Sequence, residues 1–155
     1  MRSSNGSGPS PTSLILNYEI HSWREPHWEN GSRENGNSFR VTDVAVSRDG
    51  TRMAAATTDN RIMTYDLRSR KKIDEWPMED KITSINYSTD GTLLLVNMND
   101  SEISMGKLWT LDSTTGEEVM RYEGAQQAEF VIRSCFGGAG ENFVMSGSEG
   151  KQFIL

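Results

Sequence analysis

The stretch that decides the fold is VTDVAVSRDGTRMAAATTDNRIMTYDLRSRKKIDEW, residues 41–76. Four short runs rich in apolar residues follow one another within it: Val41–Val46, Met53–Ala56, Ile62–Leu67 and Ile73–Trp76. Turn residues such as Asp49-Gly50 and Asp59-Asn60 separate them. Short runs spaced by turns at roughly 8–12 residues are typical of an antiparallel meander. No run has the i, i+3, i+4, i+7 spacing of an amphipathic helix.

The same pattern returns further along the chain. Two segments and one residue recur 41 positions later: Val41–Ser47 as Ile82–Ser88, Asp49–Thr51 as Asp90–Thr92, and Asp59 as Asp100. A third, partial copy occupies residues 131–155. A period of about 40–45 residues with four strands per unit is typical of WD-repeat blades. The chain therefore resembles the WD-repeat family. The predicted fold class is all-β, an incomplete WD40-type β-propeller of about two and two-thirds four-stranded antiparallel blades.

This resemblance predicts the organisation of the whole chain. Residues 1–13 are Ser, Gly and Pro with little to bury, and we expect them to be disordered. Residues 14–40 are interpreted as a leftover outer strand of a preceding blade (Leu14–Trp23) followed by a polar loop. The repeats fill residues 41–155, as blades at 41–77 and 82–123 and a partial blade at 131–155.

An incomplete ring has physical consequences. Even a four-bladed ring needs roughly 160 residues, more than residues 41–155 supply. Each blade buries its faces against its neighbours, so an open stack leaves apolar faces and an unpaired strand edge uncovered. We therefore expect self-association through the open blade edges.

The second unit departs from the pattern in its third strand. Tyr65 and Trp109, which match as the aromatic residues of that strand, are 44 positions apart rather than 41. About three residues are therefore inserted near Ser104–Lys107, and a strand tolerates such an insertion through a bulge.

Composition excludes several classes of partner. The chain has 155 residues, a net charge of −6 and 35% hydrophobic residues. An acidic balance argues against nucleic acid, and no apolar run approaches the roughly 18 residues of a membrane span. One cysteine and no signal-peptide pattern predict a cytoplasmic or nuclear protein. The basic run at 68–72 is interpreted as a solvated hairpin turn, with a nuclear-localisation signal as the alternative.

No catalytic residue, cofactor or metal site is predicted. His21 and His27, the two histidines, lie in a polar segment without ligand spacing or supporting groups. Cys135 falls in a strand-forming run without a nearby base and is predicted to be a buried, inert thiol. Gly137–Gly140 is predicted to be a turn, because it lacks the Lys-Ser/Thr of a phosphate loop.

Two sets of residues are candidates for roles in a binding protein. Aspartates and glycines expected to hold tight turns are Asp49, Gly50, Asp59, Asp90, Gly91 and Asp100. A partner-binding rim is expected from loops at one end of the strands, with the residues Asn60, Arg61, Met78, Glu79, Asp80, Asn99 and Gln126. The acidic and polar character of these loops favours a partner with basic or polar contacts.

The segment IRSCFGGAGENFVMSGSE, Ile132–Glu149, carries a more specific resemblance. Its Ser-Cys-Phe-Gly-Gly and Ser-Gly-Ser-Glu stretches are similar to the C-terminal propeller of the WD-repeat subunit of the CTLH/GID ubiquitin ligase complex, as is Arg40–Gly50. The resemblance implies a non-catalytic scaffold that recruits substrates or assembles the ligase for proteasomal degradation, with other protein subunits as partners. The alternative is a generic WD40 interaction module of a signalling or transcription-regulatory assembly. A propeller hydrolase is a more distant third.

Overall fold

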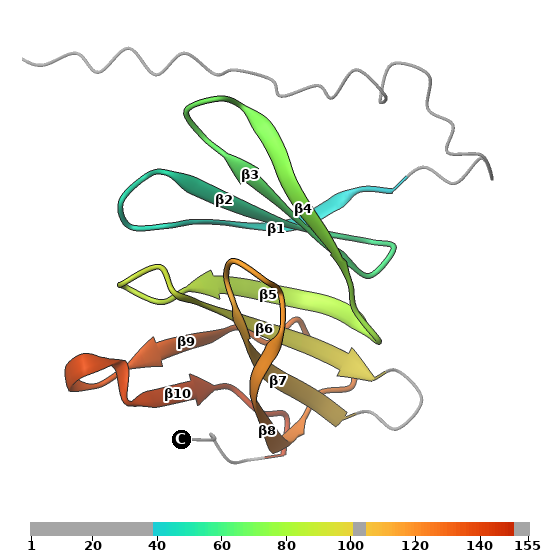
Figure 1. The fold of residues 1–155 in the computed structure, drawn as a ribbon. Helices are drawn as coiled ribbons and strands as arrows, with labels where there is room; N and C mark the ends of the chain where they lie inside the picture. Colours follow the sequence, from blue (N-terminus) through green and yellow to red (C-terminus); the bar gives the residue numbers. More distant parts are fainter. Residues whose placement is uncertain (1–38, 101–104, 151–155) are drawn as a thin grey trace, which may run out of the picture. The chain divides into compact units, whose positions relative to one another are not determined.

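The computed structural model describes residues 39–100 and 105–150, and the regular structure of these residues is almost entirely β-strand (Figure 1). The first sheet has the order β1-β2-β3-β4 and contains Val41–Val46, Arg52–Thr57, Arg61–Asp66 and Lys71–Pro77. The second has the order β5-β6-β7-β8 and contains Lys81–Tyr87, Leu93–Asp100, Met105–Asp112 and Glu118–Gln126. A two-stranded sheet pairs β9 (Ser134–Gly137) with β10 (Phe143–Ser146), and the short 3-10 helix η1 (Ala139–Glu141) lies between them.

Within each sheet, every strand pairs antiparallel with the strand that precedes or follows it in the chain, as the meander pattern predicts. The all-β, four-stranded antiparallel architecture is thus confirmed. The expected disorder at residues 1–13, the strand at Leu14–Trp23 and most of the polar loop after it lie outside the described residues.

The main core joins the first sheet to the second. Ala54 and Ala56 on β2 are fully buried, and their small side chains leave room for larger ones from the opposing sheet. The first sheet contributes Ala45, Ala54, Ala56, Ile62 and Trp76, and the second contributes Ile82, Ile85, Leu94, Val96, Met98, Trp109 and Leu111. Because these side chains come from both sheets, this core forms only where the two sheets pack together.

Strand β6 is buried on both faces. Leu94 and Val96 face the first sheet, whereas Leu95 belongs to a second cluster with Leu108 and with Val144 of β10. Successive side chains of a strand point to opposite faces, so a strand between two neighbours needs consecutive apolar residues. The run Leu93–Val96 meets that requirement.

Polar side chains connect the second sheet to the third. The fully buried Asn97 donates from Nδ2 to the carbonyl of Ile132 at 2.9 Å and to Ser134 Oγ at 3.2 Å. Ser134 Oγ lies 3.0 Å from Ser146 Oγ, and Asn86 donates to the Ser134 carbonyl at 2.7 Å. Satisfied hydrogen bonds of this kind make burial of polar groups tolerable and fix how the two surfaces meet.

The carboxylate of Asp43 in the first sheet contacts the second sheet and the residue that precedes the third. Asp43 of β1 accepts a hydrogen bond from the backbone N–H of Ile85 in β5 at 3.0 Å. Its other oxygen lies 3.3 Å from Nη1 of Arg133, the residue before β9. Strands β1 and β5 lie side by side, as do β5 and β9, and Asp43 links β1 to β5 and to the residue before β9.

The insertion in the second unit is accommodated in an unexpected way. Strand β2 aligns Met53 with Tyr65, but β6 aligns Leu94 with Leu111, so Leu111 takes the place of Tyr65. The prediction that Trp109 does so was wrong. The β6–β7 hairpin lengthens without any shift in its eight-pair register. The register shifts fall on the other side of β7, where it pairs with β8: one between Thr110 and Leu111, as between Thr64 and Tyr65 in the first sheet, and an additional one between Gly106 and Leu108.

The prediction of a buried Cys135 was also wrong. Cys135 lies in β9, and its side chain is exposed while its neighbour Ser134 is buried. The alternation of side chains along a strand places Ser134, which has hydrogen-bond partners inside, on the interior face and Cys135 on the exterior face.

A glycine in the β7–β8 turn provides a test of the sheet-to-sheet core. Gly116 has φ +74°, and a Cβ built there would lie 2.5 Å from the ring of Trp76 in the first sheet. Gly116→Ala is expected to lower the free energy of unfolding by about 1–3 kcal/mol, measured by urea denaturation. Gly50→Ala is the matched control: its φ is +67° with open space around the Cβ, so it carries the backbone strain alone. Equal losses in both variants would show that the Trp76 contact is not tight.

Candidate functional site

The turn residues Asp49 and Asp90 occupy equivalent positions between the first and second strands of their sheets. Asp49 Oδ1 accepts hydrogen bonds from Ser47 Oγ at 2.6 Å and from the Thr51 N–H at 3.0 Å. Asp90 repeats this arrangement with Ser88 and Thr92. The next residues, Gly50 and Gly91, have φ of +67° and +75°, where glycine is unstrained. Both carboxylates therefore hold their own turns.

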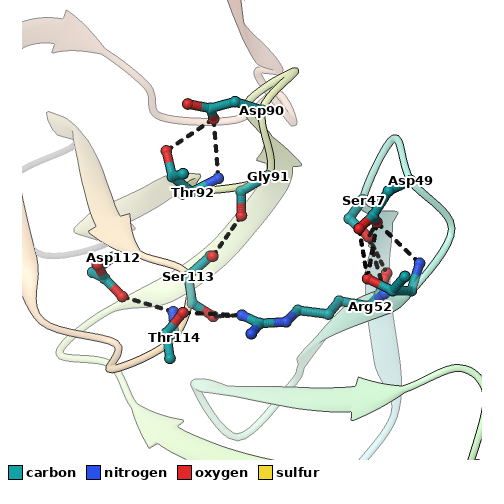
Figure 2. A pocket seen from close by; sticks show the side chains of 10 residues that line it. Ser47, Asp49, Arg52, Asp90, Gly91, Thr92, Asp112, Ser113 and Thr114 are labelled. Atoms are coloured by element: carbon teal, nitrogen blue, oxygen red, sulfur yellow. Dashed lines mark hydrogen bonds between the residues drawn. The ribbon is translucent and has the colours of Figure 1, made fainter.

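These two turns and the β7–β8 turn line a pocket (Figure 2). Arg52 crosses from the first sheet and donates from Nη1 to Thr114 Oγ1 of the second at 3.0 Å. Ser113 Oγ donates to the Gly91 carbonyl at 2.6 Å, and Asp112 accepts from the Thr114 N–H. Asp112 also accepts from the Thr115 N–H. The polar groups of the pocket are largely engaged with one another, so its main effect is to tie turns of the two sheets together.

The predicted turn residues Asp59 and Asp100 have different surroundings. Asp59 lies in the β2–β3 turn, where it accepts from Thr57 Oγ1 at 2.7 Å and forms an ion pair with Arg61 Nε at 3.5 Å. Asp100 does not lie in a turn but is the last residue of β6, paired with Met105. The longer β6–β7 hairpin moves the connection beyond it.

The rim residues lie at one end of the strands, and several belong to strand ends rather than to loops. Arg61 begins β3, Asn99 is the second-last residue of β6, and Gln126 ends β8. We define the rim as residues 58–61, 78–81, 99–100, 105–107, 124–131 and 147–149. The pairs Lys81 with Asn99, Asn99 with Gly106 and Met105 with Gln126 follow one another across the second sheet. The predicted residues are thus brought to one edge.

The part of the rim in the first sheet is held by a backbone hydrogen bond and by ion pairs. The Met78 N–H donates to the Asn60 carbonyl at 2.8 Å, and Asn60 has φ +58°, a turn conformation that Asn tolerates. Arg61 forms a salt bridge with Glu75 in addition to its contact with Asp59. The hydrogen bond to Glu75 is the largest contribution to the raised pKa of Arg61. Beside these pairs the side chain of Glu79 is exposed.

Lys107 is a rim residue that the sequence did not reveal. Its Nζ lies 2.7 Å from Asp80 Oδ2 and 3.2 Å from Asp100 Oδ2. Both hydrogen bonds raise the pKa of Lys107, and the one to Asp80 has the larger effect. Asp80 and Asp100 thus share one cation, which fixes the start of β7 against the loop before β5. The observed strand register places Lys107 in the position of Arg61, but the alignment of Tyr65 with Trp109 did not reveal that equivalence.

Glu149 is the second rim residue that sequence reasoning missed. Its Oε1 accepts three consecutive backbone N–H groups, those of Ala128 at 2.8 Å, Glu129 at 3.0 Å and Phe130 at 2.9 Å. These hydrogen bonds stabilise the ionised carboxylate and so lower the pKa of Glu149, and the bond from the Phe130 N–H has the largest effect. The only signal in the sequence was its place in the Ser-Gly-Ser-Glu stretch.

The chemistry of the rim is that of a binding surface. Glu79, Lys81 and Glu129 are exposed, whereas the cations Arg61 and Lys107 are each paired with two carboxylates. Within residues 39–100 and 105–150, no group of three or more His, Cys, Asp or Glu side chains is arranged to hold a metal ion. The same residues contain no helix long and apolar enough to cross a membrane. His21 and His27 lie outside the described residues.

Comparisons with known proteins agree with the fold. No family model matches the chain. A WD repeat-containing protein of Dictyostelium discoideum is 40% identical over 111 residues, 71% of this chain and 18% of that protein. A WD repeat-containing protein 26 homolog of Arabidopsis thaliana is 36% identical over 118 residues, covering 75% and 19%. GID complex subunit 7 of Schizosaccharomyces pombe is 33% identical over 116 residues, covering 70% and 22%.

A solved structure shows the same architecture. The crystal structure of the Cps50 (Swd1) β-propeller domain of Myceliophteria thermophila matches with a TM-score of 0.61 at 18% identity, over 76% of this chain and 34% of that one. The sheets described above are therefore WD40-type β-propeller blades, and the predicted fold class is confirmed. The chain belongs to the WD-repeat family, and its relatives include a GID complex subunit. It spans about a fifth of the length of the first curated relatives it matches.

The turn carboxylates predict a specific acid dependence of stability. Hydrogen bonds from Ser47 and then Thr51 lower the pKa of Asp49 from 3.8 to about 2. Because its folded-state pKa is depressed, this carboxylate stabilises the fold above pH 3.8, and the contribution is lost as pH falls towards 2. Asp49→Asn should therefore unfold at lower urea concentration than the parent chain at pH 7, and the gap should close between about pH 4 and pH 2.

The control for this experiment is Glu117→Gln, which removes an exposed carboxylate from the β7–β8 turn. This carboxylate accepts no hydrogen bond from the part of the chain that the structure describes. Urea midpoints that run parallel for Asp49→Asn and the parent chain down to pH 2 would contradict the assigned role of Asp49.

Proposed function

We propose that the chain is a non-catalytic scaffold that binds other proteins through the rim. The observation that carries this proposal is the acidic, internally braced rim. Glu79 and Glu129 are exposed, while neighbouring strand ends are fixed by the Lys107 and Arg61 ion pairs and by the Glu149 carboxylate. A surface that is already ordered pays less conformational entropy when a partner binds. Acidic side chains on it favour a partner with basic groups.

More specifically, we propose that it acts as part of a WD-repeat subunit of a GID-type ubiquitin ligase, in substrate recruitment or in assembly of the complex. Similarity to GID complex subunit 7 over 70% of this chain supports this proposal, as does the segment Ile132–Glu149. The partners would then be protein subunits of the ligase, in the cytoplasm or the nucleus. The proposal includes no role for nucleic acid, membrane, metal or cofactor, and no reaction step.

Binding through the rim can be tested with a single charge reversal. The probe is a purified GID-type complex lacking its own WD-repeat subunit, and affinity is measured by biolayer interferometry. Glu79→Lys is expected to weaken binding about tenfold, with a larger loss at low ionic strength, because an attractive charge becomes repulsive. Asp80 is a poorer choice, since its reversal would also repel Lys107 and disturb the rim.

The matched control is Glu117→Lys, the same reversal at the other end of β7 from the rim. It is expected to bind like the parent chain. If the complex does not bind the parent chain, the ligase role is wrong. If it binds and Glu79→Lys binds equally well, the assignment of this part of the rim as the contact is wrong.

We also propose that the isolated chain self-associates. Val44 and Val46 on the outer face of β1 are 48% and 52% exposed, and Phe143 and Met145 on β10 are 51% and 39% exposed. Apolar sheet faces of this kind associate with one another in water. Sedimentation velocity of the parent chain should show concentration-dependent oligomers, and Val46→Lys should shift them towards monomer.

The control for self-association is Val119→Lys on the outer strand β8, a side chain with 54% exposure that does not belong to either face. It should leave the sedimentation profile unchanged. A parent chain that remains monomeric over the whole accessible concentration range would overturn this proposal.

A further inference from the structure

Two adjacent apolar side chains on the rim are more exposed than the other large hydrophobic residues that the structure describes. Phe130 is 69% exposed and Val131 is 66% exposed. Single exposed apolar residues are ordinary on protein surfaces. A consecutive aromatic and β-branched pair in a loop among acidic residues is less ordinary, and aromatic residues are enriched among those that dominate binding energy.

The exposure of these two side chains does not result from a loosely held backbone. The N–H of Phe130 donates to Glu149 Oε1 at 2.9 Å, and its carbonyl accepts from Nε2 of Gln127 at 3.1 Å. Gln127 is itself 1% exposed. On the far side of Val131, the carbonyl of Ile132 accepts from the buried Asn97 at 2.9 Å. Both ends of the pair are thus fixed to the second and third sheets.

The loop is also tied to the segment that follows β10 by a second set of hydrogen bonds. The N–H of Gln126 donates to Ser148 Oγ at 3.1 Å, and the N–H of Glu149 donates to the Gln126 carbonyl at 2.9 Å. Because the loop is already ordered, an occupant would not have to supply the free energy of ordering it.

The charge around the pair indicates what kind of occupant fits. Glu129 precedes Phe130 and is exposed, and Glu149 beneath the loop is ionised, with its pKa lowered by the backbone N–H groups. The nearby cation Arg133 is engaged by Asp43 at 3.3 Å. An apolar centre with acidic neighbours complements a segment that combines apolar and basic side chains.

We propose that Phe130 and Val131 form the apolar anchor of the rim, and that they bind a basic, amphipathic protein segment. The apolar side chains of that segment pack on the pair, and its Lys or Arg side chains approach Glu129. This inference rests on the proposed function of the rim and adds the chemistry of the partner.

The first experiment selects peptides from a random-peptide phage library on the full chain. Selected peptides are expected to combine aromatic or aliphatic residues with Lys or Arg. Phe130→Ser should bind them about tenfold more weakly or worse, and Phe130→Leu should retain most of the affinity. Phe143→Ser, the same change at another exposed phenylalanine, is the matched control and should bind normally. Circular dichroism of each variant checks that the fold is intact.

Glu149→Gln tests the importance of the fixed loop. It should accelerate hydrogen exchange at the amides of residues 128–130 and weaken the same peptides, although Phe130 is still present. Selected peptides that bind Phe130→Ser as well as the parent chain, or a selection that enriches none, would overturn the anchor.

The same variants measured against the GID-type complex separate the two proposals. If the complex binds and Phe130→Ser has no effect on it or on the peptides, only the anchor is wrong. If selected peptides need Phe130 but the complex does not bind, the anchor stands and the ligase role is wrong.

Discussion

The structure depends on the burial of the second sheet from both sides. Leu94 and Val96 face the first sheet while Leu95 faces the third, and all three are 1% exposed or less. Full burial of an aliphatic side chain stabilises a fold by about 1.5–3 kcal/mol, whereas an exposed ion pair contributes about 0.2–1 kcal/mol. The apolar contacts between sheets therefore dominate stability. The ion pairs of the rim have a smaller part in it, and their main effect is on the geometry of the surface.

The two sides of the second sheet are nevertheless packed differently. Its contact with the first sheet is largely apolar, with Ala54 and Ala56 opposite larger side chains. Its contact with the third sheet combines a small apolar cluster with the hydrogen bonds of Asn97 and Ser134. Apolar packing is tolerant of small shifts, but hydrogen bonds require defined positions. The polar side therefore fixes the third sheet, and through the Ile132 carbonyl it also fixes the end of the rim loop 124–131.

The sequence predicted the parts of the fold that are set locally. Turn chemistry at Asp49-Gly50 and Asp90-Gly91 placed the ends of strands correctly, because these turns need φ above zero and a carboxylate acceptor. It predicted less where tertiary contacts decide. The register of β6 with β7 depends on pairing across the hairpin, so counting from Tyr65 to Trp109 did not find it. Likewise, Cys135 lies on the exposed face of β9 because Ser134 finds its hydrogen-bond partners, Asn97 and Ser146, on the buried face.

The same distinction applies to the rim. Acidic loops could be recognised from composition, and the structure brings Met78, Glu79 and Asp80 to the same edge as Asn99 and Gln126. Of the groups that fix this edge, Glu149 contacts backbone N–H groups 19 to 21 positions before it, and Lys107 joins Asp100 to Asp80, 27 positions before Lys107. Local sequence patterns did not reveal these contacts. Their positions have a common consequence. Lys107 neutralises two carboxylates and Glu149 accepts from three backbone donors, so both side chains are engaged with internal partners. The side chains that remain exposed, Glu79, Glu129 and the pair Phe130–Val131, are then presented to solvent on a backbone that is already fixed.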